Sequence, residues 1–153
     1  MKHIKMQFRE NVFIWLRENV LYLAWLQAFA AMAVSLYFSE LMHLPPCILC
    51  WYQRILMYPL VIIIAVGIIK KDKNIHWYIL PFTILGMLTA FYHTLIQAGL
   101  VPTLLLPCTS GVSCASKYLD LFGFITIPLL SPAAFAFITI CTLIHLKLNK
   151  KLL

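Results

Sequence analysis

Charged residues are scarce in this chain. Only 11% of its 153 residues are Asp, Glu, Lys or Arg and 63% are hydrophobic, whereas about a quarter of the residues in soluble domains are charged. This shortage excludes an ordinary soluble globular protein. Acidic residues are the scarcest, and the formal net charge is +7. Because the basic residues stand in short clusters between apolar runs and form no stripe along a helix, nucleic acid is not an expected partner.

The chain also lacks an internal repeat, a low-complexity linker and room for a soluble domain. Roughly 20 apolar residues of helix cross a hydrocarbon core of about 30 Å. Four segments meet that requirement: Val20 to Phe38, Cys50 to Ile69, Trp77 to Gln97 and Phe122 to Leu146. The sequence therefore predicts an all-α integral membrane protein, with residues 1–153 forming a single domain built as a four-transmembrane-helix bundle.

Lysine and arginine are unevenly distributed among the connecting segments. Ten of the twelve precede the first apolar segment, lie between the second and third, or follow the fourth. The positive-inside rule then predicts that both termini are cytoplasmic and that residues 39–49 and 98–121 form outer loops. A cleaved signal peptide is disfavoured, because cleavage after Ala30 would interrupt an apolar run that continues to Phe38.

Four of the five cysteines fall on the outer, oxidising side of this topology. Cys47 and Cys50 form a Cys-x-x-Cys pair at the first outer loop, and Cys108 and Cys114 fall in the second. Cys141 lies about 18 residues into the fourth helix, which is about 25 Å deeper. We expect Cys141 to be a packed apolar side chain.

The stretch "HLPPCILCWYQR", residues 43–54, predicts a reactive cysteine pair. Pro45-Pro46 favours an extended backbone and the apolar run begins at once, so Cys47 and Cys50 are expected at a helix N-terminus. The free N–H groups and the helix dipole stabilise a thiolate there, which also makes a disulfide easier to reduce. Two inert structural disulfides are an alternative interpretation of the four outer cysteines.

The second pair, in "PCTSGVSC", lies in a different setting. Five residues rich in Ser, Thr and Gly separate Cys108 from Cys114, so a flexible loop is expected that lets the sulfurs meet or part. Upstream, Pro102 and Pro107 bracket an uncharged apolar strip. This strip could lie on the membrane interface or offer an extended peptide to a partner's groove.

Two ionisable residues are predicted near the same membrane depth. Arg54 follows Cys50 by four residues and Cys47 by seven, so the three share a helical face. In "FYHTLIQ", His93 lies about one turn from the outer end of the third helix. Each residue alone is explained as an interfacial side chain. Together they predict a polar pocket beneath the thiols, whose donors suit the carbonyl oxygens of a lipid-soluble quinone.

These segments together resemble the DsbB-type disulfide bond formation proteins. The resemblance rests on "PCILCWYQR", "YHTLIQ", the later cysteine pair and "FGFITIP", and the short second loop is most similar to the Gram-positive, BdbC-like branch. It implies a thiol-disulfide oxidoreductase of the bacterial cytoplasmic membrane that reoxidises a DsbA-like, thioredoxin-fold partner on the outer face. Electrons would pass to a non-covalently bound quinone, menaquinone or ubiquinone, so that disulfides are made de novo. Arg54 and His93 match the family positions beside the quinone head group.

The resemblance also implies a catalytic role for each of the four outer cysteines. The partner's thiolate would attack Cys108, and Cys114 would then attack the Cys47–Cys50 disulfide. Cys50 would leave as a thiolate beside the quinone, and Cys47 would complete the disulfide again. Gram-negative members have a much longer stretch between the second-pair cysteines, so the order of attack at Cys108 and Cys114 stays open here.

A metal-binding membrane protein is the alternative from another class. The four outer cysteines could form a closed four-thiolate site such as zinc takes. The oxidising location opposes that interpretation, and it gives no use to Arg54 or His93. Vitamin K epoxide reductase relatives are less similar, because their Cys-x-x-Cys lies late in the chain.

Overall fold

The computed structural model of the chain describes residues 2–101 and 127–150. These form helices, of which those before residue 98 are joined by short connections. The elements are α1 (Lys2–Leu36), a π-helical turn η1 (Tyr37–Leu41), α2 (Ile48–Lys70), α3 (His76–Gln97) and α4 (Ile127–Lys150). Within the described residues, four helical spans are long and apolar enough to cross a membrane. The predicted all-α, four-helix membrane class is confirmed.

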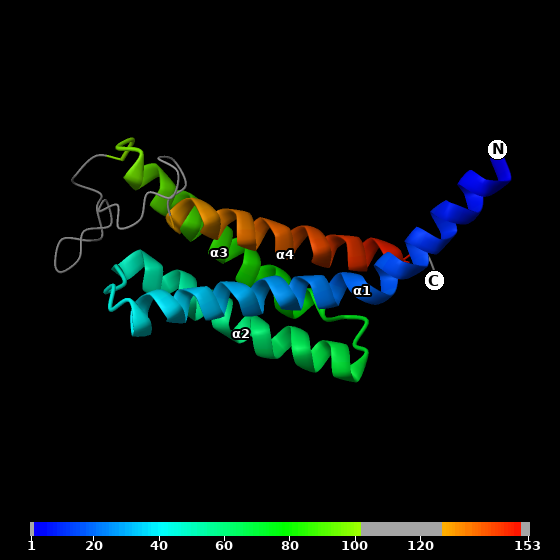
Figure 1. Cartoon of the computed structure of the whole chain (residues 1–153), viewed down its shortest axis with the longest axis horizontal. Coiled ribbons are helices and arrows are strands. Elements are labelled where there is room, and N and C mark those ends of the chain that lie inside the picture. The colour runs from blue at the N-terminus through cyan, green and yellow to red at the C-terminus, as the bar shows by residue number, and fades with distance from the viewer. Residues whose placement is uncertain (1, 102–126, 151–153) are drawn as a thin grey trace.

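The boundaries of the spans differ somewhat from those expected. The spans are Asn19–Leu41, Ile48–Lys70, His76–Gln97 and Leu130–Asn149. The first span is longer than expected because the backbone passes from α1 directly into η1, where Met42 N donates to Tyr37 O. The N-terminal part of α1 continues beyond the apolar run and projects from the bundle (Figure 1). Residues 122–126, expected to begin the fourth helix, and residues 102–121 of the second outer loop lie outside the described part of the chain.

The helices run alternately up and down, so the connections fall at the two ends of the bundle. α1 packs against α2 and α4, and α3 packs against the same two helices. Both chain termini and the α2–α3 turn lie at one end, and the α1–α2 connection lies at the other with the C-terminal end of α3 (Figure 1). The Cys-x-x-Cys segment is therefore at the end of the bundle opposite the termini.

A glycine and a tryptophan hydrogen bond lie where neighbouring helices approach closely in the core. Gly86 of α3 lies against the fully buried ring of Phe135 of α4, where a β-carbon would overlap the ring. Such close approach of backbones is typical of helix packing in membranes. Trp25 Nε1 donates to Val61 O at 3.1 Å and links α1 to α2. Cys141 is buried in the same core, which confirms its prediction as a packed apolar side chain.

Candidate functional site

Cys47 is the N-cap residue of α2. Its backbone is extended, with φ −70° and ψ 168°, and the helix begins at Ile48, as the proline pair before it predicts. The chain reaches this point through His43, whose φ of 50° lies in the left-handed region. Cys50 N–H donates to Cys47 Sγ at 3.3 Å. The sulfur thus takes the capping place that a Ser or Asp oxygen usually fills at a helix N-terminus.

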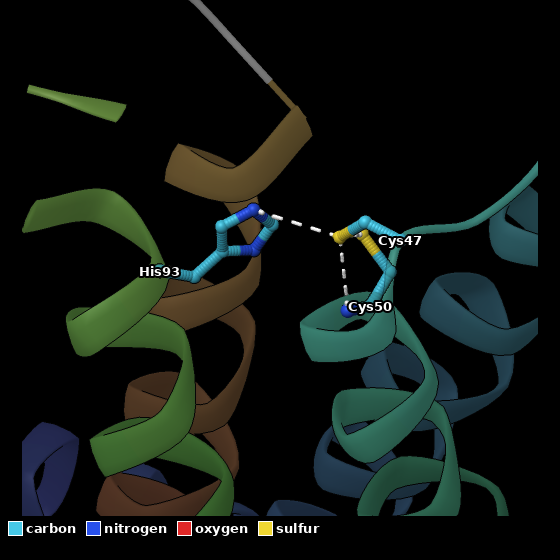
Figure 2. Close-up of side chains that lie close together, drawn as sticks. All are labelled: Cys47, Cys50 and His93. Carbon is cyan, nitrogen blue, oxygen red and sulfur yellow. Dashed lines mark hydrogen bonds between the residues drawn. The ribbon is translucent and has the colours of Figure 1, made fainter. Parts of the chain in front are cut away.

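The two thiols of the pair are in direct contact. Both cysteines are free, and their Sγ atoms lie 2.8 Å apart in a thiol hydrogen bond. Cys47 is buried and Cys50 is half-buried at the first turn of α2 (Figure 2). Because the sulfurs already meet, a disulfide between them requires rotation of side chains and no movement of helices.

His93 reaches the pair from α3, on the other side of the site (Figure 2). Its Nε2 lies 3.8 Å from Cys47 Sγ, and the side chain is only 1% exposed. The helix ends at Gln97, so His93 lies one turn from its end as expected. The sequence predicted that His93 and Arg54 share a membrane depth and line one polar pocket, and that pocket stays a prediction. The structure shows a direct contact between His93 and the first thiol.

Gln53 is a site residue that the sequence analysis missed. Its Nε2 lies 3.2 Å from His93 Nδ1, and the side chain is buried in α2. When the amide nitrogen donates to Nδ1, the ring proton sits on Nε2 and points at Cys47 Sγ. In this amide orientation, Gln53 holds His93 as the tautomer that carries its proton on Nε2. The available signal was an amide in an apolar helix, since a polar group buried at membrane depth needs a hydrogen-bond partner.

Arg54 points toward α1. Its Nη2 donates to Ser35 O at 3.0 Å, in the last turn of α1, and its guanidinium carbon lies 5.7 Å from the centre of the Trp51 ring. Tyr58 O–H donates to Ser35 Oγ at 3.3 Å beside it. Arg54 is thus fixed one turn below Cys50, and among the residues that the structure describes it uses one of its five N–H donors.

The second cysteine pair cannot be placed relative to the first. Cys108 and Cys114 lie outside the described residues. Their contact with Cys47 and Cys50, whether for disulfide exchange or for a four-thiolate metal site, stays a prediction.

Hydrogen bonds that converge on Cys47 lower the pKa of its thiol. The largest contribution comes from the Cys50 thiol, burial opposes it, and His93 and the Cys50 backbone N–H add further lowering. Cys47 lies just outside the span that begins at Ile48. In the dithiol state a thiolate is therefore favoured on Cys47. The family resemblance implies a thiolate on Cys50 in another state, in which Cys47 is bonded to the attacking cysteine. The two assignments concern different redox states.

A pH titration checks this assignment in a variant that keeps only the Cys47–Cys50 pair. We expect the ultraviolet thiolate absorbance of the reduced protein to persist at neutral pH and to disappear only on acidification, because the pKa of Cys47 lies well below the ordinary 9.0. His93→Ala should move the midpoint upward, since one stabilising donor is lost. A midpoint near the ordinary thiol value in both proteins would contradict the assignment.

Known proteins similar to this chain are disulfide formation proteins. The family model "Disulfide bond formation protein DsbB" matches residues 17–145. "Probable disulfide formation protein C 2" of Bacillus cereus is 44% identical over 137 residues, which cover 90% of this chain and 96% of that protein. "Disulfide bond formation protein C" of Bacillus subtilis is 47% identical over 120 residues, covering 78% and 87%. No solved structure matches the chain. The chain therefore belongs to the DsbB family, as a multi-pass membrane protein of disulfide bond formation.

Proposed function

We propose that this protein oxidises a DsbA-like, thioredoxin-fold partner outside the cytoplasm and passes the electrons to a membrane quinone. The observation that carries the proposal is the Cys47–Cys50 pair at the N-terminus of a membrane-spanning helix, with a buried histidine on the first sulfur and an arginine one turn below the second. A structural disulfide has no need of either residue. A pair that must exchange with thiols and also meet a lipid-soluble oxidant has use for both.

The charge distribution supports an outer location for this pair. Ten of the twelve lysines and arginines belong to the two terminal segments and to the α2–α3 connection, and these three regions share one end of the bundle (Figure 1). The positive-inside rule assigns that end to the cytoplasm. The cysteine pair then faces the oxidising side of the bacterial cytoplasmic membrane.

The proposed reaction balances as two thiols plus quinone giving one disulfide plus quinol. The partner's thiolate attacks Cys108 and breaks the Cys108–Cys114 bond, and Cys114 then attacks Cys47 and displaces the Cys50 thiolate. The partner's second thiolate closes the partner's own disulfide and releases Cys108, which re-forms its bond to Cys114 and releases Cys47. Cys47 and Cys50 form their disulfide again as two electrons leave. A bound quinone supplies the two-electron acceptor.

The donor set at the site fits a quinone head group. A quinone presents two carbonyl oxygens, which need hydrogen-bond donors and no counter-charge. Arg54 uses one N–H on Ser35 O and is held half-buried at the edge of the bundle, where lipid-dissolved molecules have access. Its remaining N–H groups can donate to a carbonyl beside Cys50, since they lie one turn below that thiol.

Replacement of Arg54 tests the quinone assignment. Arg54→Gln removes a charged donor, and hydrogen bonds to charged groups contribute about 1.5–3 kcal/mol. We therefore expect the KM for quinone to rise about tenfold or more, while the KM for the reduced partner is unchanged. Lys70→Gln, at the opposite end of α2, is the matched control. Equal changes in both KM values for Arg54→Gln would contradict the assignment and indicate a general loss of structure.

A further inference from the structure

The Cys47, Cys50 and His93 side chains, besides the role proposed for them in disulfide exchange, present two sulfur donors and one nitrogen donor close together. We propose that the dithiol form of this protein binds one thiophilic divalent cation, of the Zn²⁺ class, through Cys47 Sγ, Cys50 Sγ and His93 Nε2. This site differs from a closed site of four thiolates, because it needs neither Cys108 nor Cys114. It also stands without the proposed quinone or partner.

The three donor atoms are already close enough to share one ion. All of them lie within 4.8 Å of one another, with Cys47 Sγ 3.8 Å from His93 Nε2 and 2.8 Å from Cys50 Sγ. Tetrahedral Zn²⁺ binds sulfur at about 2.3 Å and nitrogen at about 2.0–2.1 Å, which sets its donor atoms about 3.6–3.8 Å apart. The Cys47–His93 separation suits that geometry as it stands. Rotation of the Cys50 side chain supplies the remaining adjustment.

The charges of the cluster suit a divalent ion at the edge of the membrane. Two thiolates offset the 2+ charge of the ion and the imidazole is neutral, so the ion with its three ligands carries no net charge. An uncompensated charge is costly at this depth, and a neutral complex avoids that cost. Binding requires Cys50 to lose its thiol proton to solvent, and the fourth position of the ion stays open, as in zinc sites with three protein ligands.

Gln53 provides the outer contact that a histidine ligand requires. A metal-bound Nε2 carries no proton, so the ring proton must move to Nδ1. The Gln53 amide lies 3.2 Å from Nδ1, and a half-turn of the amide presents its oxygen there as an acceptor. Gln53 can therefore serve both tautomers of His93. Loss of such an outer contact typically weakens metal binding 10–100-fold.

Metal binding and disulfide formation would exclude each other at this pair. A disulfide uses both sulfurs and leaves neither as a thiolate ligand, so only the dithiol form can bind the ion. A bound ion holds both sulfurs and blocks their oxidation. The cation would thus act as an inhibitor that holds the protein in its reduced state.

Cobalt titration of the full chain in lipid nanodiscs tests the site without any assay of activity. The protein is reduced with a phosphine, and Co²⁺ is the probe because thiolate-to-cobalt charge transfer gives a distinct absorption. We expect one Co²⁺ per chain, displaced by Zn²⁺, and no absorption after the cysteines are oxidised. The comparison of reduced with oxidised wild-type protein needs no substitution, so it does not depend on the folding of a variant.

Four variants locate the ion. Gln53→Leu should weaken Co²⁺ binding about 10–100-fold, and His93→Ala, which removes a ligand, should weaken it more. Cys141→Ala and the double variant Cys108→Ser/Cys114→Ser should bind as the wild type does. Loss of the absorption in the double variant would assign the ion to a four-thiolate site and overturn the proposal. Unchanged affinity in His93→Ala, or absorption that survives oxidation, would overturn it equally.

Discussion

Cys50→Ala is expected to abolish quinone reduction by the reduced partner. Without Cys50 the first pair cannot form a disulfide, so Cys114 has nothing to attack and no thiolate is released beside Arg54. Among the described cysteines, Cys50 alone is half-buried on the first turn of α2. Cys47 is the buried N-cap residue, and Cys141 is buried in the core of the bundle. The measurement is the loss of quinone absorbance under anaerobic conditions with a reduced thioredoxin-fold partner.

The matched control for that experiment is Cys141→Ala. Cys141 is a buried thiol with no part in the proposed exchange, so its replacement should leave the rate of quinone reduction unchanged. The thermal midpoint of both variants should be recorded beside the rates, to separate loss of chemistry from loss of fold. Quinone reduction that persists in folded Cys50→Ala protein would contradict the role assigned to Cys50.

Gly86→Ala is expected to destabilise the bundle substantially. The added β-carbon would overlap the Phe135 ring, which is fully buried, so either the ring or the helix backbone must shift. Overpacking of this kind costs about 1–3 kcal/mol. Because His93 follows Gly86 by two turns on the same face of α3, separation of α3 from α4 should also disturb the contact with Cys47. A thermal unfolding midpoint in a fixed detergent measures the effect.

A double-mutant cycle identifies the cause of that destabilisation. Phe135→Leu alone loses core contacts, but in combination with Gly86→Ala it removes the overlap, so the pair should be less destabilised than the sum of the single variants. Leu88→Ala, on the lipid-exposed side of the same helix, should have little effect. Strictly additive losses for Gly86 and Phe135 would show that their contact is not the cause.

Local sequence signals predicted the parts of the site that lie on one helix. The lengths of the apolar runs gave four spans, and the proline pair before Cys47 placed the thiols at the start of α2, because both features act through the backbone nearby. The spacing of Arg54 from Cys50 was sufficient to place the two one turn apart on one face.

Contacts between helices were harder to predict. The sequence placed His93 and Arg54 at one depth, but it gave no sign that His93 contacts Cys47 or that Arg54 bonds to Ser35 O. Gln53 was overlooked because its partner is 40 positions away on another helix. The choice among polar partners depends on helix rotation and on which side chains reach across, and periodicity within one segment does not encode either.

The balance between quinone consumed and disulfide formed tests the proposed function most directly. Purified protein in lipid nanodiscs is mixed anaerobically with an excess of reduced thioredoxin-fold partner and a limiting amount of quinone, and both products are counted. The proposal predicts one quinol for each new partner disulfide. When quinone is omitted, the reaction should stop once the protein's own disulfides have been used. Continued disulfide formation without quinol would contradict it.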